Sequence, residues 1–325
     1  MKKWLLGIVG ALVVLGLAFV LGPRPEVSDT VRFDPATIGD DVDEWLNLRE
    51  ADVPNLKEGA RRRIVWADPA TKARTPLAIV YLHGFSATTE EVRPLPDQVA
   101  QTLGANLHFA RLTGHGRDGR AMATGSANAW LNDTAEALAV GRRIGERVIL
   151  MSTSTGGTLG TWAAENPKLM EGVAGHVMIS PNYEVAAGGA GMLTMPWGRT
   201  LVPMIAGAQR SFEAMNDEHG RWWTTQYPTV ALIPMQATVE RAAAVAVEDI
   251  AQPALFVFHP DDTVVKASAT EAVAARWGAN TGAKASVHRV TSSQDPNNHV
   301  IAGRILSPAN TEPLAAVIVD WVRAL

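Results

Sequence analysis

The 325-residue chain contains no cysteine. Disulfide bonds, zinc sites with cysteine ligands, catalysis by a thiol and lipid attachment to cysteine are therefore excluded. The lack of cysteine leaves the cellular compartment open, because a periplasmic protein can also fold without disulfides.

The sequence also lacks an excess of one charge. Its formal net charge is −4, with both signs scattered along the chain, and no basic run of the kind that binds nucleic acid is present. No nucleic-acid partner is therefore expected. No His-x-x-x-His pair or metalloprotease motif occurs. His259, Asp261 and Asp262 could form part of a metal site, but nothing else in the sequence requires one, so we expect neither a metal nor another cofactor.

One long apolar run is present, from Trp4 to Gly22, and two lysines precede it. Lysines before an apolar stretch are typical of a secretory signal, and the run is also long enough to cross a bilayer as a helix. No small-x-small cleavage site closes the run, because Phe19, Val20 and Leu21 occupy the positions concerned. An uncleaved inner-membrane anchor is thus favoured over a cleaved signal. In both cases the body would face the periplasm or the cell exterior.

Composition divides the chain into segments. Residues 1–22 form the predicted anchor or signal peptide, with membrane association through residues 4–22. Residues 23–60 are polar and contain proline, which predicts a linker and lead-in. Strand-like and helix-like patterns alternate over residues 61–182 and 251–325, the predicted core. Residues 183–250 are rich in glycine, proline, methionine and tryptophan, lack strand alternation, and are predicted to form an inserted cap.

Seven short runs of branched apolar residues predict strands that are buried on both faces, as in a parallel sheet. They cover residues 63–67, 77–82, 106–112, 147–152, 173–180, 254–259 and 285–290. Helical patterns lie between and after them, over residues 90–103, 128–145, 155–165, 267–277 and 312–324. This alternation predicts a mostly parallel α/β sheet covered by helices on both faces. Such sheets bind ligands beyond the carboxyl ends of their strands.

A serine stands at a sharp turn between a predicted strand, 147–152, and a predicted helix. This is the context of a nucleophile elbow, which needs small residues two positions before and after the serine because the backbone bends tightly. Ser154 is the candidate nucleophile, since Gly156 meets this requirement, although Ser152 stands where glycine is usual. Ser152 is the weaker candidate, because Leu150 lies two positions before it. The alternative is a turn that only caps the helix.

Acyl transfer needs backbone N–H donors aimed at the oxyanion. The residue after the candidate nucleophile, Thr155, would supply one donor at the start of a helix, where the dipole favours negative charge. The loop after the strand 77–82 would supply the second, from Phe85, because the glycine before it allows a sharp turn. His83 and His115 are interpreted as structural histidines, since the oxyanion is held by backbone donors.

A serine hydroxyl also needs a base that takes its proton and a third group that orients the base. The strand 254–259 ends in Asp261 and Asp262, where a carboxylate can receive an imidazole N–H. Asp262 is favoured, because the Thr-Val-Val turn after it returns the chain to the core. The alternative is that either aspartate caps the next turn. His299, in a polar loop after one further strand, is the candidate base.

These motifs resemble the α/β-hydrolase superfamily over residues 62–325. The motifs are His83-Gly84-Phe85, Leu112-Thr113-Gly114-His115-Gly116, the Ser154 elbow, Asp262-Thr263-Val264-Val265 and His299, and they are similar to those of the esterase and monoacylglycerol-lipase branch. The resemblance implies a sheet of about eight strands, a cap inserted before the acid-bearing strand, and Phe85 and Thr155 as oxyanion donors. Members with an aspartate nucleophile, such as epoxide hydrolases and dehalogenases, are disfavoured by Ser154.

The predicted function is hydrolysis of carboxylic esters through an acyl-enzyme, with a short- to medium-chain acyl ester or a monoacylglycerol as the small-molecule substrate. Met192, Trp197, Trp222 and Trp223 in the cap are candidate substrate-binding residues, because methionine and tryptophan suit an apolar pocket. Each of them could instead pack the cap against the sheet. The alternative functions are an amidase, peptidase or thioesterase with the same triad, and a non-catalytic binding protein that keeps the fold.

Overall fold

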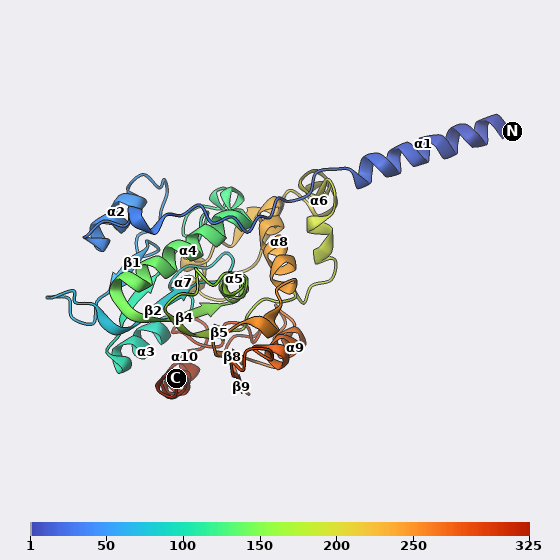
Figure 1. Cartoon of the computed structure of the whole chain (residues 1–325). Coiled ribbons are helices and arrows are strands. Elements are labelled where there is room, and N and C mark those ends of the chain that lie inside the picture. The colour runs from blue at the N-terminus through green and yellow to red at the C-terminus, as the bar shows by residue number, and fades with distance from the viewer. Residues whose placement is uncertain (1) are drawn as a thin grey trace.

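The computed structural model describes residues 2–325 and has a seven-stranded sheet at its centre (Figure 1). In spatial order the strands are β1 (Arg63–Val65), β3 (Asn106–Phe109), β2 (Thr75–Leu82), β4 (Gly145–Thr153), β5 (Val173–Ile179), β8 (Ala254–Phe258) and β9 (Ala285–Arg289). All neighbouring strands are parallel except β1 and β3, which pair antiparallel. The predicted mostly parallel α/β sheet is confirmed.

The number of strands differs from the eight or so that the resemblance implies. Each of the seven apolar runs forms one strand, but the chain before β1 contains no such run outside the N-terminal helix. It forms an extended stretch and the helix α2 (Val42–Ala51), which begins after Asp41, whose side chain accepts the N–H of Glu44. Within residues 2–325, β1 is therefore the last strand at that edge of the sheet.

Helices cover both faces of the sheet, as predicted. One face packs against α4 (Ala127–Ile144), α5 (Thr155–Ala164) and α9 (Ala267–Arg276), and the other against α3 (Leu95–Leu103) and α10 (Pro308–Arg323). Alternate residues of β2 serve the two cores: Val80 and Leu82 join the first, Ile79 and Tyr81 the second. This alternation is the two-residue period of a strand. Burying such a side chain contributes about 1.5–3 kcal/mol.

One helix begins later than predicted. The pattern over residues 90–103 predicts a helix, with Pro94 and Pro96 in its first turn or before it, and α3 begins at Leu95. Pro94 is the cause, because proline disfavours the helical conformation in the residue before it. Glu90 and Glu91 consequently lie in the loop that precedes α3, and both are buried.

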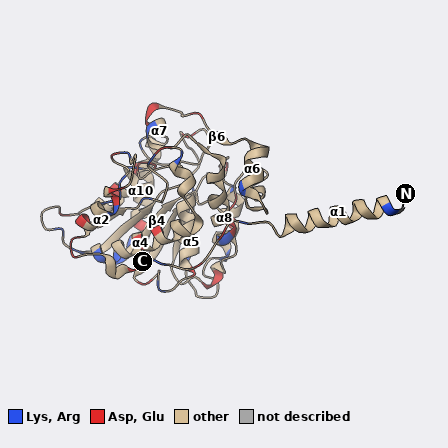
Figure 2. Ribbon diagram, turned by 90° about the horizontal axis from the view of Figure 1, so that it is seen from above, with Lys and Arg blue, Asp and Glu red and all other residues tan. Residues whose placement is uncertain are grey.

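The N-terminal helix α1 (Lys2–Val20) projects from the body (Figure 1), which confirms the predicted apolar helix. Among the described residues it is the one helix long and apolar enough to cross a membrane, and none of its span Lys3–Val20 is buried. Figure 2 shows Lys and Arg on this helix only at its N-terminal end. The segment 23–60 then runs along α4, where Asn132 Oδ1 accepts the N–H groups of Arg32 and Phe33.

Residues 183–250, here called the inserted segment, lie between β5 and β8. They contain α6 (Gly198–Ala206), β6 (Gln209–Ser211), α7 (Asp217–Trp222), β7 (Gln226–Pro228) and α8 (Leu232–Ala243). The strands β6 and β7 form a separate antiparallel pair, and α8 packs against α5. The described residues also contain five 3-10 helices: η1 (Pro35–Thr37), η2 (Ala121–Thr124), η3 (Ala190–Thr194), η4 (Thr229–Ala231) and η5 (Val247–Asp249).

Candidate active site

Ser154 occupies the turn between β4 and α5 with a strained backbone, at φ 51° and ψ −117°. Residues other than glycine rarely adopt such a φ, and strain of this kind concentrates at functional sites. The Ser154 N–H donates to Ile179 O at 2.9 Å, and its carbonyl accepts the Asn182 N–H at 3.1 Å. The turn also requires Gly156, because a Cβ there would lie 2.3 Å from Leu82 O.

Ser152 is accommodated where glycine is usual. Its side chain is buried at the end of β4, and its hydroxyl donates to Val177 O of the neighbouring strand at 3.3 Å. The hydroxyl is therefore satisfied inside the sheet, and the turn at Ser154 keeps its geometry. This contact also separates the roles of the two serines, since Ser152 is bound to the sheet backbone.

His299 lies between Ser154 and Asp262. Its Nε2 is 3.0 Å from Ser154 Oγ, and its Nδ1 is 2.7 Å from Asp262 Oδ2. The ionised carboxylate only accepts hydrogen bonds, so it selects the tautomer with the proton on Nδ1. Nε2 is then free to accept the serine proton. The three predicted residues are thus brought together from β4, from the end of β8 and from the loop after β9.

The two neighbouring aspartates are placed differently. Oδ1 of Asp262 accepts the N–H groups of Val264 and Val265 at 2.8 and 3.0 Å, which leaves Oδ2 aimed at His299. Asp261 is exposed, and its side chain accepts no hydrogen bond from the described residues. The Thr-Val-Val turn that favoured Asp262 in the sequence supplies these backbone donors.

Two opposing effects act on the pKa of His299. Burial disfavours the imidazolium, but the charge and hydrogen bond of Asp262 outweigh it, so the pKa of His299 lies above its usual value. Glu91 and Asp295 add smaller contributions in the same direction. Since a base must be unprotonated to accept the serine proton, this shift moves the onset of base function to higher pH.

Two positioning residues were missed in the sequence. Asp295 is 2% exposed, and its Oδ2 accepts the backbone N–H groups of His299 and Val300 at 3.1 and 2.8 Å. The Ser180 hydroxyl donates to His299 O at 2.7 Å. The sequence offered only their positions as a signal: Asp295 lies four residues before His299, and Ser180 follows the carboxyl end of β5.

The two predicted oxyanion donors flank Ser154. Phe85 and Thr155 line the same cavity as this serine, and neither backbone N–H has an acceptor among the described residues. Thr155 is the first residue of α5, where unpaired N–H groups and the helix dipole favour a negative charge. Both predicted donors are therefore unpaired and line the cavity over Ser154.

Both histidines near this loop are buried inside it. The backbone N–H of Leu112 donates to His83 Nε2 at 3.1 Å, and His83 Nδ1 lies 2.9 Å from Gly84 O. Burial lowers the pKa of His83 to about 4 and keeps the ring neutral. His115 packs against the rings of His83 and Phe85, and burial lowers its pKa as well. This placement agrees with their interpretation as structural residues.

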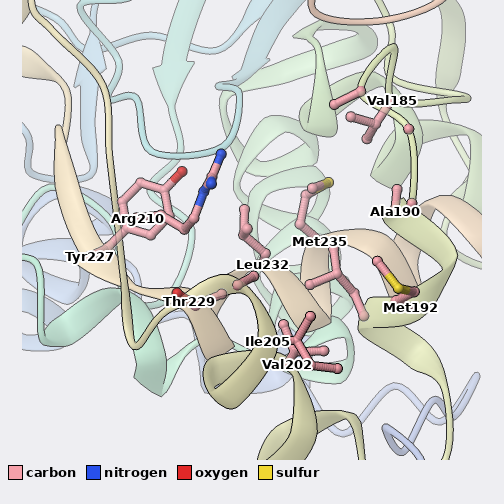
Figure 3. A pocket seen from close by; sticks show the side chains of 15 residues that line it. Val185, Ala190, Met192, Val202, Ile205, Arg210, Tyr227, Thr229, Leu232 and Met235 are labelled. Carbon is pink, nitrogen blue, oxygen red and sulfur yellow. The ribbon is translucent and has the colours of Figure 1, made fainter.

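Two adjoining cavities lead away from Ser154. The first has a volume of about 430 Å³ and lies over the serine, while the second has about 270 Å³. They share a wall that includes Arg210, Tyr227, Leu232 and Met235. Figure 3 shows Leu232 and Met235, both from α8, among the side chains that line the second cavity.

The four candidate substrate-binding residues separate into two pairs. Met192 lines the second cavity and Trp223 the first. Trp222 and Trp197 line neither. The Trp222 indole donates to Glu218 at 3.0 Å, and the Trp197 indole donates to Ala18 O of α1 at 3.0 Å. The apolar character of a tryptophan therefore did not distinguish cavity lining from packing.

The chain is similar to known lipolytic proteins. The thermostable monoacylglycerol lipase of Bacillus sp. (strain H-257) is 25% identical over 199 residues, which are 61% of this chain and 76% of that protein. A solved structure from the metagenome-derived lipolytic enzymes LipS and LipT has a TM-score of 0.67 at 19% identity, over 83% of this chain and 100% of that one. The monoacylglycerol lipase of Paleococcus ferrophilus has a TM-score of 0.58 at 15% identity, over 81% and 98%.

At these identities the solved structures establish a common fold. The family model described as "Alpha/beta hydrolase family" matches residues 79–302, well over half of the chain. That span begins in β2, includes the Ser154 elbow and ends just after His299. The protein therefore belongs to the alpha/beta hydrolase family.

Proposed function

We propose that this protein is a serine esterase in which Ser154 is the nucleophile, His299 the general base and Asp262 the acid that orients it. The observation that carries the proposal is the double contact of His299, at 3.0 Å to Ser154 Oγ and 2.7 Å to Asp262 Oδ2. A serine hydroxyl is a weak nucleophile without such a base. The similarity to lipolytic family members supports ester substrates.

The geometry supports a two-step reaction. Ser154 Oγ attacks the acyl carbonyl while its proton moves to His299 Nε2, and the oxyanion accepts the N–H groups of Phe85 and Thr155. Collapse of this intermediate breaks the ester bond, and the leaving alkoxide takes the proton from Nε2. Water then attacks the acyl-enzyme, again giving a proton to Nε2. That proton returns to Ser154 Oγ as the carboxylic acid leaves, while Asp262 stabilises the transient imidazolium.

We propose a short- to medium-chain acyl ester or a monoacylglycerol as the substrate. The second cavity supports this choice, because Met192, Leu232 and Met235 give it an apolar wall that continues from the cavity over Ser154. An apolar cavity with a few polar groups is typical of a site for a small apolar ligand. The acyl chain would lie in the second cavity.

We further propose that α1 anchors the protein to the inner membrane with its body outside, or that the body is secreted if the segment is cleaved. The backbone N–H of Trp197 donates to Pro23 O at 2.8 Å, and this hydrogen bond holds the inserted segment beside the end of α1. Met204 and Ile205 of α6 are 77% and 65% exposed, and Ile205 also lines the second cavity. Figure 1 shows α6 next to the junction with α1. This arrangement supports a substrate that arrives from lipid.

The test compares Ser154→Ala with Ser152→Ala as a matched control. With p-nitrophenyl esters of increasing chain length, Ser154→Ala should lose at least about 10³-fold in kcat/KM, whereas Ser152→Ala should stay within about tenfold of wild type. A fluorophosphonate probe should label wild type and Ser152→Ala but not Ser154→Ala, because only an activated serine reacts. Equal ester rates for wild type and Ser154→Ala would refute the nucleophile. If amides or thioesters are cleaved faster than esters, the protein is an amidase or a thioesterase instead of an esterase. If the fluorophosphonate does not label the wild-type protein, a non-catalytic binding protein is favoured.

A further inference from the structure

A carboxyl group that the proposed reaction does not use lies in the wall of the cavity over Ser154. It belongs to Glu91, which is 2% exposed and lines this cavity. Its Oε2 accepts the Gly84 N–H at 2.7 Å and the Tyr81 O–H at 3.1 Å. Its Oε1 has no hydrogen-bond partner in residues 2–325.

The free oxygen, Oε1, and the Ser154 side chain both lie close to Gly84. A Cβ built on Gly84 would lie 2.7 Å from Glu91 Oε1 and 3.1 Å from Ser154 Cβ. The carboxyl oxygen and the serine therefore come near the same point of the loop, which only a glycine leaves open. Oε1 thus lies beside the loop that continues into Phe85, in the wall of the cavity over Ser154.

Glu91 also connects the two segments that carry the oxyanion donors. Gly84, whose N–H it accepts, directly precedes Phe85. The hydroxyl of Tyr81, the second group that donates to Glu91, lies 3.0 Å from Thr153 Oγ1. Thr153 is the residue before Ser154. One carboxyl group therefore contacts the first donor loop directly and the elbow through a single tyrosine.

On the basis of the proposed esterase function, we propose that Glu91 is a positioning residue which joins the two halves of the oxyanion hole and acts in its protonated form. Two donors converge on Oε2, so a proton on the group resides on Oε1 and points toward the cavity. As a neutral acid, Glu91 holds both segments without opposing an oxyanion. As a carboxylate, it would repel the oxyanion and stabilise the protonated form of His299.

The surroundings of Glu91 support the neutral form below about pH 7. Burial raises the pKa of Glu91 to about 7, and the Gly84 N–H, the charge of His299 and the Tyr81 hydroxyl only partly oppose this rise. The titratable groups that face it are Tyr81 from β2 and His299 from the loop after β9. Asp262 binds the His299 ring and Asp295 accepts the His299 backbone N–H, and neither carboxylate has a hydrogen bond to Glu91 in the described residues.

The test is the pH profile of kcat/KM for Glu91→Gln on a p-nitrophenyl ester. A carboxamide accepts the same hydrogen bonds and donates into the cavity as the neutral acid does, but it cannot ionise. We expect equal rates at about pH 6, and a ratio of variant to wild type that rises about threefold or more by about pH 8.5.

The control is Glu90→Gln, which removes the neighbouring carboxylate. Glu90 binds Arg93 and Arg304 in ion pairs and does not line the cavity, so its ratio to wild type should not change with pH. A second variant, Tyr81→Phe, removes a donor that lowers the pKa of Glu91, and should move the alkaline decline of the rate to higher pH.

Three results would overturn the proposal. If the ratio of kcat/KM between Glu91→Gln and wild type does not change with pH, Glu91 has a purely structural role. An unchanged alkaline decline in Tyr81→Phe would show that Glu91 does not cause it. A wild type that neither cleaves esters nor reacts with a fluorophosphonate would refute the esterase function together with this inference, whereas active enzymes with parallel profiles would refute the inference alone.

Discussion

Asp295 binds the backbone of His299 and not its ring: one carboxylate oxygen accepts the N–H groups of His299 and Val300 at 3.1 and 2.8 Å. The other oxygen accepts the Asn297 N–H at 3.0 Å. The carboxylate therefore organises the turn that presents the imidazole, while Asp262 orients the imidazole itself.

The first prediction concerns this turn. Asp295→Ala leaves two buried N–H groups without an acceptor, which should lower the free energy of unfolding by about 2–4 kcal/mol. The base should also be displaced, with a loss of about 10–100-fold in kcat/KM. Urea denaturation and ester kinetics measure the two effects. Asp261→Ala is the control, because that exposed side chain accepts no hydrogen bond from the described residues; equal behaviour of the two variants would contradict the prediction.

The second prediction concerns the acid. Asp262→Asn removes the charge that raises the pKa of His299 and disturbs the tautomer of the ring. The maximal rate should fall by about 10³–10⁴-fold. The acid limb of the residual activity should move to lower pH, since the histidine then loses its proton more readily. Asp261→Asn should leave both quantities unchanged, and a comparable loss in that variant would reassign the acid.

The third prediction tests Glu91 through stability alone. Its folded pKa of about 7 lies above the usual value of 4.5, so the folded state binds this proton more tightly than the unfolded state. The stabilisation is complete below pH 4.5 and is lost as the pH rises toward 7. Glu91→Gln should therefore gain stability relative to wild type as the pH rises, by an amount on the order of 3 kcal/mol. Urea denaturation at several pH values would detect it, and a constant difference would rule it out.

The fourth prediction concerns the shared wall of the two cavities. Leu232→Trp should narrow the passage between them, so kcat/KM for medium-chain esters should fall about tenfold relative to the acetyl ester. Trp222→Phe changes a buried aromatic residue of the inserted segment outside both cavities, and should leave the chain-length profile unaltered. If kcat/KM of Leu232→Trp falls equally for esters of every chain length, the substitution has disturbed the whole active site and has not filled an acyl-binding site.

Local sequence patterns predicted the sheet well because its central strands are apolar runs buried on both faces, whereas the edge strands β1 and β9 are only partly buried, contrary to the expectation for them. The same reasoning placed the site, since parallel strands bring their carboxyl ends to one edge. Ser154, Asp262 and His299 each follow such an end, so their meeting could be anticipated from order alone. The range predicted for α3 begins too early because the helical pattern continues through Glu90 and Glu91, although Pro94 was expected in the first turn or before the helix and is the residue directly before it.

The remaining contacts depend on tertiary structure. Trp197 and Trp222 were assigned to the pocket by residue type. In the structure their indole N–H groups donate to Ala18 O and Glu218, and neither residue lines a cavity near Ser154. Glu91 gave no signal, because a glutamate beside another glutamate before a helix is ordinarily a solvated residue. Its burial follows from the loop of Gly84 folding over it, which no local pattern encodes.

The path of the chain after α1 has a mechanical consequence. The stretch from residue 23 to residue 33 is fastened to α4 at Asn128 and Asn132, and Asp29 accepts the indole N–H of Trp162 in α5 at 2.7 Å. A pull on α1 would load the contacts of Ala18 and Pro23 with Trp197 first and then these hydrogen bonds, and would leave the sheet unstressed. Because α5 begins directly after Ser154, tension on the N-terminus would reach the helix behind the elbow before any strand.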